Sequence, residues 1–163
     1  MIELAKSLIA DSAFAPPKNI LQALDAKAAH ARPSHAIPHS IYEEVWHMAY
    51  WQEISLDWVQ GKPTPVPEHA AGGFPSDADS QEPWDSLRDR FLSGAQNSAA
   101  IANDRDGLEI RVACPTIDAP HRTMTVREQL ESLAAHNAYH LGRIVLLRQL
   151  MNLWPPPDGG FTW

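Results

Sequence analysis

Two helix-start signals constrain the fold of this chain more than any other feature. Ser40 with Glu43, and Thr125 with Glu128, have the spacing of a capping box, in which each side chain accepts a hydrogen bond from the other residue's backbone N–H. Each signal opens a long segment with apolar residues at helical spacing, and glycine or proline residues close both segments. The sequence therefore predicts two long helices, each with one buried face.

Further signals predict two more helices. Prolines suited to a first helical turn open residues 16–30 and 83–104, while the capped helices span about 40–60 and 125–152. Residues 62–82 are dense in Pro, Gly, Ser and Asp, which predicts a long loop of the kind that often has a function. Four helices without a convincing sheet predict an all-α four-helix bundle, a fold that builds its sites from side chains on facing helices.

The chain outside these helices carries weaker signals. Residues 108–114 alternate apolar and polar side chains like a strand, but no partner strand is evident, so we interpret them as irregular. Prolines 155–157 must end the last helix, and we expect the tail to lay Trp154 and Trp163 back against the bundle. A length of 163 residues suits one domain, so we predict a single domain over 1–163.

Composition excludes several classes of protein. The net charge of −7, from 13 Lys and Arg against 20 Asp and Glu, would repel a phosphate backbone, so we expect no nucleic-acid partner. The single cysteine, Cys114, cannot form an internal disulfide, and the N-terminus lacks the pattern of a secretory signal. No run of about 18 apolar residues occurs, so we predict a soluble, cytoplasmic protein without membrane contact.

Two histidines interrupt the apolar face of the last predicted helix. His136 and His140 share this face with Leu133, Ile144 and Leu147. Residues four apart lie one above the other on a helix, about 5–6 Å apart at Cβ, so both imidazoles can bind one ion. The pair therefore indicates a metal site, although chance and a hydrogen-bonded core histidine explain such pairs about equally well.

A third histidine, on the second predicted helix, strengthens the metal interpretation. His47 shares its face with Glu44, Trp51, Ile54 and Trp58, a stripe that must also face the core. An unsatisfied buried imidazole costs about 1–3 kcal/mol, whereas one divalent ion would satisfy all three rings. The alternative is that hydrogen bonds satisfy the three histidines without metal. The remaining histidines fall in predicted loops or at helix ends, and we interpret them as solvated: His30, His35, His39, His69 and His121.

The segments WHMAYWQ, HNAYHLGRIVLLRQL and LWPPPDGGFTW together resemble the DinB-like (DinB/YfiT) superfamily of four-helix metalloproteins. The resemblance covers most of the chain and implies an up-down-down-up bundle, frequent homodimers and a divalent metal bound by His47, His136 and His140. It also implies, from characterised branches, transfer or isomerisation reactions that depend on low-molecular-weight thiols such as bacillithiol, mycothiol or glutathione. One departure is Arg143, where relatives often have glutamine. This cation could steer an anionic substrate or lie on the rim of the bundle.

Three neutral histidines leave at least one coordination position open, as in catalytic metal sites. Imidazole ligands suit Zn, Ni, Fe or Cu and do not choose among them. A bound water or substrate thiol would be acidified and become a nucleophile near neutral pH. Glu43 and Glu44, close to His47, are the candidate catalytic residues, acting as a base or orienting that histidine. Both also suit an ordinary first helical turn.

Aromatic residues near the histidines allow two interpretations. Trp46, Trp51 and Trp58 could line a pocket for an apolar small-molecule substrate or fill the core, and core packing is the default for Tyr50 and Tyr139. Three hypotheses for the function follow. The first is a metal-dependent transferase, isomerase or hydrolase acting on a small electrophile. The others are a metal- or ligand-binding bundle without turnover, and a helical interaction protein without metal.

Overall fold

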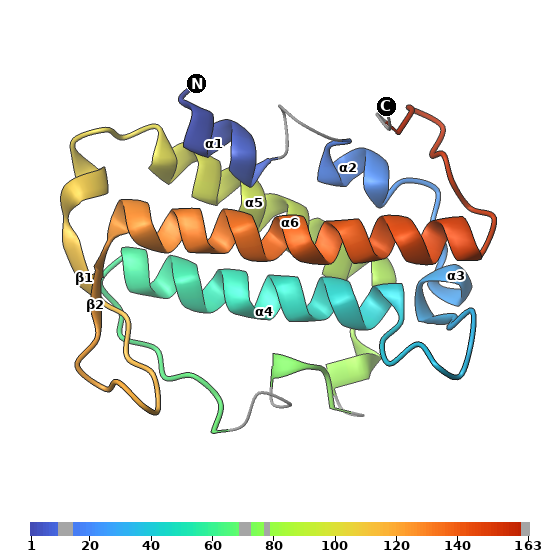
Figure 1. Ribbon diagram of the computed structural model, residues 1–163, viewed down its shortest axis with the longest axis horizontal. Helices are drawn as coiled ribbons and strands as arrows, with labels where there is room; N and C mark the ends of the chain where they lie inside the picture. Colours follow the sequence, from blue (N-terminus) through green and yellow to red (C-terminus); the bar gives the residue numbers. More distant parts are fainter. Residues whose placement is uncertain (10–14, 69–72, 77–78, 161–163) are drawn as a thin grey trace.

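The computed structural model of the chain describes residues 1–9, 15–68, 73–76 and 79–160. Three long helices form its body (Figure 1): α4 Ile41–Val59, α5 Trp84–Ala102 and α6 Val126–Leu150. Three short helices precede them: α1 Glu3–Leu8, α2 Pro17–Ile20 and α3 Ala26–His30. These ranges also contain the strands β1 Arg111–Ala113 and β2 Thr123–Thr125 and the 3-10 turns η2 Asp79–Gln81 and η3 Gly107–Glu109. The predicted all-α class is therefore confirmed.

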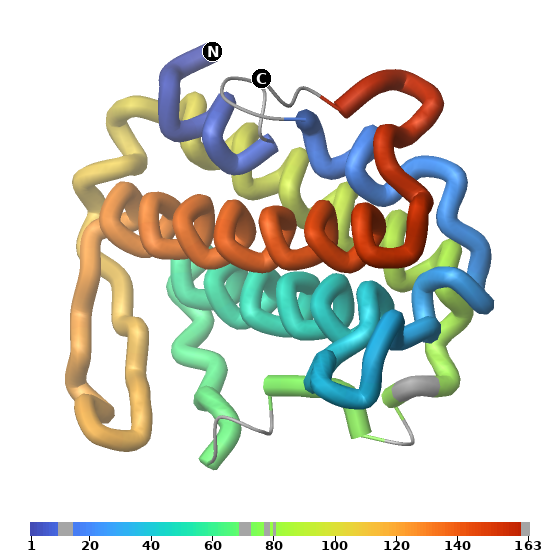
Figure 2. Tube along the Cα trace, turned by 45° about the vertical axis from the view of Figure 1, so that its right-hand side comes forward, coloured from blue at the N-terminus to red at the C-terminus, as the bar shows by residue number. Residues whose placement is uncertain are grey.

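The short N-terminal helices take the place of a fourth long helix. α1 packs on α5 and α6, α2 packs on α6, and α3 packs on α4 and α5. α4 and α6 run side by side in both views of the chain (Figures 1 and 2). Among the described residues, no helix is both long and apolar enough to cross a membrane.

Both predicted capping boxes form at the starts of α4 and α6. Ser40 Oγ accepts from the Glu43 backbone N–H at 3.3 Å, and Glu43 Oε2 accepts from the Ser40 N–H at 2.6 Å. Thr125 Oγ1 accepts from the Glu128 N–H at 3.1 Å, and Glu128 Oε2 accepts from the Thr125 N–H at 2.8 Å. These bonds satisfy N–H groups that a helix leaves free at its start. α4 and α6 therefore begin where the sequence predicts.

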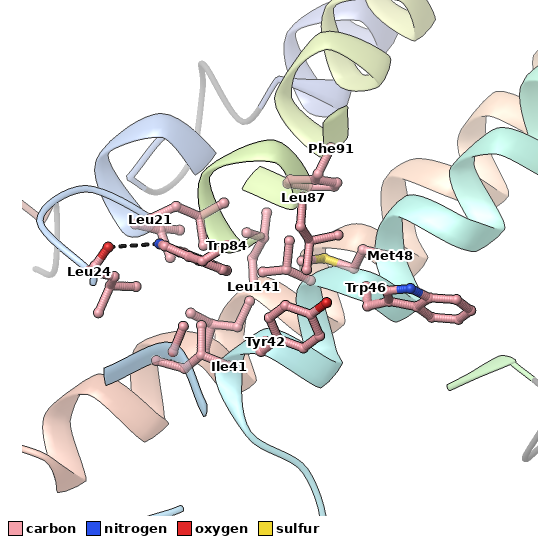
Figure 3. Close-up of a cluster of buried hydrophobic side chains, with 14 of the residues drawn as sticks. Leu21, Leu24, Ile41, Tyr42, Trp46, Met48, Trp84, Leu87, Phe91 and Leu141 are labelled. Atoms are coloured by element: carbon pink, nitrogen blue, oxygen red, sulfur yellow. Dashed lines mark hydrogen bonds between the residues drawn. The ribbon is translucent and has the colours of Figure 1, made fainter. Parts of the chain in front are cut away.

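The prediction of one helix over 16–30 is wrong. The chain turns between α2 and α3, where Ala23 has a left-handed backbone with φ of 54°. Arg148 of α6 donates to the carbonyls of Ile20, the last residue of α2, and Gln22. Trp84 Nε1 of α5 donates to the Leu24 carbonyl at 2.7 Å (Figure 3). A continuous helix would use these carbonyls in its own hydrogen bonds. The tertiary contacts therefore favour a turn.

The interpretation of residues 108–114 as irregular is also wrong in part. Arg111–Ala113 pairs antiparallel with β2, so that Val112 lies opposite Met124. The partner strand is 3 residues long and ends at Thr125, the N-cap of α6, which leaves it no pattern of its own in the sequence. The hairpin lies beyond the end of α4 (Figure 2).

Two clusters of buried apolar side chains lie toward opposite ends of α6. One includes Leu141 and Ile144, packed against residues of α4, α5 and the turn after α2 (Figure 3). The other includes Leu130 and Leu133. Burial of each such side chain contributes about 1.5–3 kcal/mol. The α6 segment between the clusters, residues 134–140, carries the two histidines predicted to bind metal.

The chain after α6 folds back on the bundle. Trp154 packs against the first cluster, and the Arg148 guanidinium lies over its ring at 5.8 Å. Asn19 Nδ2 of α2 donates to the Asp158 carbonyl at 3.3 Å. The predicted packing of the tail is confirmed for Trp154, whereas Trp163 lies outside the described residues.

Candidate metal centre

The three predicted ligands meet between α4 and α6. His47 comes from α4 and His136 and His140 from α6, and one ring nitrogen of each lies within 4.8 Å of the others. The Nε2 atoms of His47 and His136 are 3.1 Å apart. His47 and His140 are buried, and His136 is half-buried. The fold thus confirms that three imidazoles from two helices converge.

Hydrogen bonds at Nδ1 orient two of the rings. His47 Nδ1 donates to the Gly73 carbonyl at 2.7 Å, and His140 Nδ1 donates to Glu44 Oε2 at 2.6 Å. Because a carbonyl or an ionised carboxylate only accepts, the proton of each neutral ring lies on Nδ1. Both rings therefore present an Nε2 lone pair to the space between the helices.

A chain of amide groups orients His136. Gln52 Nε2 donates to the Phe91 carbonyl at 2.9 Å, so Gln52 Oε1 is left to accept from Asn137 Nδ2 at 3.4 Å. Asn137 Oδ1 is then the acceptor for His136 Nδ1 at 3.3 Å. Gly94 makes room for this chain, because a Cβ there would lie 2.1 Å from Gln52 Nε2. His136 therefore also directs its Nε2 lone pair toward the centre.

Glu44 connects the triad to a cation. The Glu44 side chain is 0% exposed, and its Oε1 lies 2.8 Å from Arg143 Nη2 while Oε2 accepts from His140. Arg143 Nη1 also donates to Tyr139 OH at 3.2 Å. A buried carboxylate is costly without a positive partner. The Arg143 side chain is 35% exposed, so it lies at the rim, the second of the two alternatives, and from there it also supports His140 through Glu44.

The donor set fits a divalent cation. With the protons on Nδ1, two lone pairs face each other between His47 and His136 at 3.1 Å, which is repulsive unless a cation lies near both. Burial away from water is the largest effect on both rings and lowers the pKa of each to about 4, which disfavours a proton near neutral pH. Zn–N bonds of about 2.0–2.1 Å at tetrahedral angles place two nitrogens about 3.3 Å apart, close to the spacing observed.

Comparison with known proteins identifies the family of this chain. The family model described as the DinB superfamily matches residues 18–144. The chain belongs to the DinB superfamily. No curated protein and no solved structure matches it significantly. The range matched by the DinB model includes His47, His136 and His140, and therefore the whole triad.

A short segment after α4 covers His47 in this DinB-superfamily chain. Phe74 stacks on His47 with ring centroids 4.2 Å apart and on His39 at 3.8 Å, so His39 is half-buried rather than solvated. Gly73 approaches so closely that a Cβ there would lie 2.7 Å from Trp51 Nε1. Neither Gly73 nor Phe74 was predicted. The glycine pair in AAGGFP was the available signal, since paired glycines permit such an approach.

Glu43, the other candidate acid, belongs to the start of α4. Its Oε1 accepts from Arg32 Nη2 at 2.6 Å, and its Oε2 accepts from the Ser40 N–H at 2.6 Å. Burial raises the pKa of the Glu43 carboxyl, but the hydrogen bonds from Arg32 and Ser40 outweigh it and hold the pKa below its usual value. The capping alternative therefore describes Glu43, and Glu44 is the acid that contacts the triad.

A cleft opens beside His136. It has a volume of about 420 Å³ and lies between α4, α6, the segment after α4 and the β1–β2 hairpin. Trp51 and Trp58 line it and also pack in the second core cluster, so both alternatives describe them. Trp46 instead stacks on Tyr50, with ring centroids 5.1 Å apart, at the first core cluster. The DinB site thus has an accessible space next to one of its three histidines.

Proposed function

We propose that this DinB-superfamily chain is a metal-dependent enzyme that acts on a small electrophilic molecule, as a thiol-dependent transferase or isomerase or as a hydrolase. The observation that carries the proposal is the convergence of one ring nitrogen from each of three histidines beside a cleft, with each Nδ1 already engaged by the protein. A structural zinc site normally has four protein ligands, whereas three leave a position for water or substrate.

His47, His136 and His140 would hold the ion, and imidazole ligands suit zinc, nickel or iron. When bound, a divalent ion supplies a Lewis acid that makes a coordinated water or thiol nucleophilic near neutral pH. The choice between water and a low-molecular-weight thiol rests on the family resemblance.

The protein's own contribution is to hold the ligands in place. The two oxygens of Glu44 are engaged by His140 and Arg143, so we assign Glu44 to positioning His140 rather than to proton abstraction. Gly73 and Asn137 engage the Nδ1 atoms of the other two rings. All three rings are therefore set in the tautomer that a metal requires.

Metal analysis combined with turnover assays tests this function. The purified chain should contain a divalent ion, and it should convert some member of a panel of electrophiles with water alone or with glutathione, mycothiol or bacillithiol. His136→Ala should lose both metal and turnover, whereas His121→Ala, an exposed histidine, should keep both. Turnover that persists after all metal has been removed would contradict the proposal.

A further inference from the structure

The cleft beside His136 restricts the class of substrate. We propose that the cleft binds the body of the substrate, meaning the part that does not react, and that this part is uncharged, flat and apolar. The reacting end then lies at the histidine triad. This inference rests on the proposed function, because the reacting end is held there only if the triad holds a metal. It adds the shape and charge of the molecule, which the triad does not specify.

The cleft runs along α6 away from the triad. His136, Ser132 and Gln129 line it from this helix. The helical rise of about 1.5 Å per residue places Gln129 roughly 10 Å from His136 along the axis. Trp51 and Trp58 line the same cleft from α4. An elongated molecule can therefore extend from the triad to Gln129.

Flat apolar surfaces form much of the wall. Two indole rings, of Trp51 and Trp58, face the cleft together with Leu133 and Val66. Trp58 is held in place because its Nε1 donates to the Thr64 carbonyl at 2.7 Å. Burying an aromatic or aliphatic group against such surfaces is favourable, and indole rings also favour stacked or edge-on contacts with another ring.

The buried polar residues of the cleft carry no charge. Ser55 and Gln129 are 5% and 6% exposed, and Gln129 Nε2 donates to Ser55 Oγ at 2.9 Å. Within the described ranges no donor reaches Gln129 Oε1, so it can accept from a hydroxyl or amide of the substrate. The charged lining residues, Glu68, Asp118 and Arg122, are exposed at the rim. A charge on the buried body would thus be desolvated without a partner.

Hydroxamates test this proposal because the hydroxamate group binds divalent metal ions while its substituent occupies the adjoining space. With the zinc-loaded chain, benzohydroxamate should bind at least about tenfold more tightly than acetohydroxamate, since its ring buries aromatic surface. 4-Carboxybenzohydroxamate should bind more weakly than benzohydroxamate, because its carboxylate would lie in the uncharged part of the cleft. Isothermal titration calorimetry measures the three dissociation constants.

A matched pair of variants locates the effect. Ser132→Phe fills the cleft one turn from His136 and should abolish the preference for benzohydroxamate over acetohydroxamate. Glu131→Phe, an exposed neighbour that does not line the cleft, should keep the preference. Equal affinities of the wild-type chain for benzohydroxamate and acetohydroxamate would overturn the assignment of the cleft but not the proposed function. Tighter binding of 4-carboxybenzohydroxamate than of benzohydroxamate would do the same. Failure to take up any of zinc, nickel and iron, and with it failure to bind acetohydroxamate, would overturn the proposed function, and this inference with it.

Discussion

Arg148 and the histidine triad are two polar groups against α6, and their surroundings differ. Near the end of the helix, Arg148 is 2% exposed and donates to the carbonyls of Ile20, Gln22 and Leu153. In the middle, His136 and His140 of α6 meet His47 of α4: each ring engages its Nδ1 with the protein, and the Nε2 atoms of His47 and His136 lie 3.1 Å apart. A buried polar group with all its partners in the protein supports the fold, whereas buried nitrogens that face a shared space could bind an ion.

Arg148 connects segments that are distant in the sequence. Its three carbonyl partners lie at the end of α2, in the turn after it and in the chain after α6. Burial lowers the pKa of its guanidinium, because no water solvates the charge. The contacts of Arg148 are therefore structural, whereas the triad brings together ring nitrogens that could hold an ion. The following experiments test this difference.

Arg148→Met should have the largest effect on stability. It leaves three carbonyls without their donor, and each unsatisfied group costs about 1–3 kcal/mol, so the free energy of unfolding should fall by about 3 kcal/mol or more. Zinc affinity of the folded protein should not change. Urea unfolding and zinc titration measure the two quantities.

Arg127→Met is the matched control on the same helix. It removes an ion pair with Glu109 that lies at the surface, so it should change stability little. A loss of zinc affinity in Arg148→Met as large as that in His136→Ala would remove the distinction between the two polar groups.

Chelator should destabilise the wild-type protein but not the triad variants. Binding to the folded state adds RT ln(1 + [L]/Kd), about 2.7 kcal/mol at a hundredfold excess over Kd. His47→Ala and His136→Ala should each lose most of the metal, and the double variant should lose little more, because ligands of one site act together. Thermal unfolding with and without EDTA measures the effect, with His121→Ala as control. Full metal occupancy in His47→Ala would show that the site does not join the two helices.

Glu44→Gln should weaken zinc binding by about 10- to 100-fold, because it removes the carboxylate that orients His140. Arg143→Gln should act in the same direction, since it leaves that carboxylate buried without its cation. Competition with a chromophoric chelator measures both affinities. Glu43→Gln alters the neighbouring acid in the helix cap and should leave zinc affinity unchanged. Equal effects of the Glu43 and Glu44 changes would exclude a specific role for Glu44.

The last prediction concerns the pH dependence of the metal-free protein. Burial lowers the pKa of His47 and His136 from 6.5 to about 4, so between these values the unfolded chain binds more protons than the folded one. Stability should therefore fall as pH drops from about 6.5 to 4, and this contribution should level off below 4. Thermal unfolding across this range should show a shallower slope for His136→Ala. Arg148→Met should keep the wild-type slope, because arginine stays charged throughout. Identical slopes for all three proteins would show that burial does not keep the rings neutral.

The sequence by itself determined the features that depend on near neighbours in the chain. α4 and α6 begin at capping boxes, whose hydrogen bonds join residues three positions apart. His136 and His140 lie one turn apart on the same face of any helix over this range, and the period of α4 turns His47 toward the same core. The sequence around these histidines also resembles the DinB superfamily, and the match of the family model confirms that assignment.

Only the tertiary structure decided which distant groups complete these features. The helix predicted over 16–30 is interrupted because Arg148 and Trp84 hold its carbonyls from other helices, and no local pattern encodes those partners. Gly73 and Gln52 support two histidine rings for the same reason, since buried polar atoms bond to whatever groups the folded chain brings near. Local hydrogen bonds and periodicity act over a few residues, whereas burial joins residues at any separation in the chain. The convergence of the three histidines could therefore be predicted from the sequence, but the groups that orient them could not.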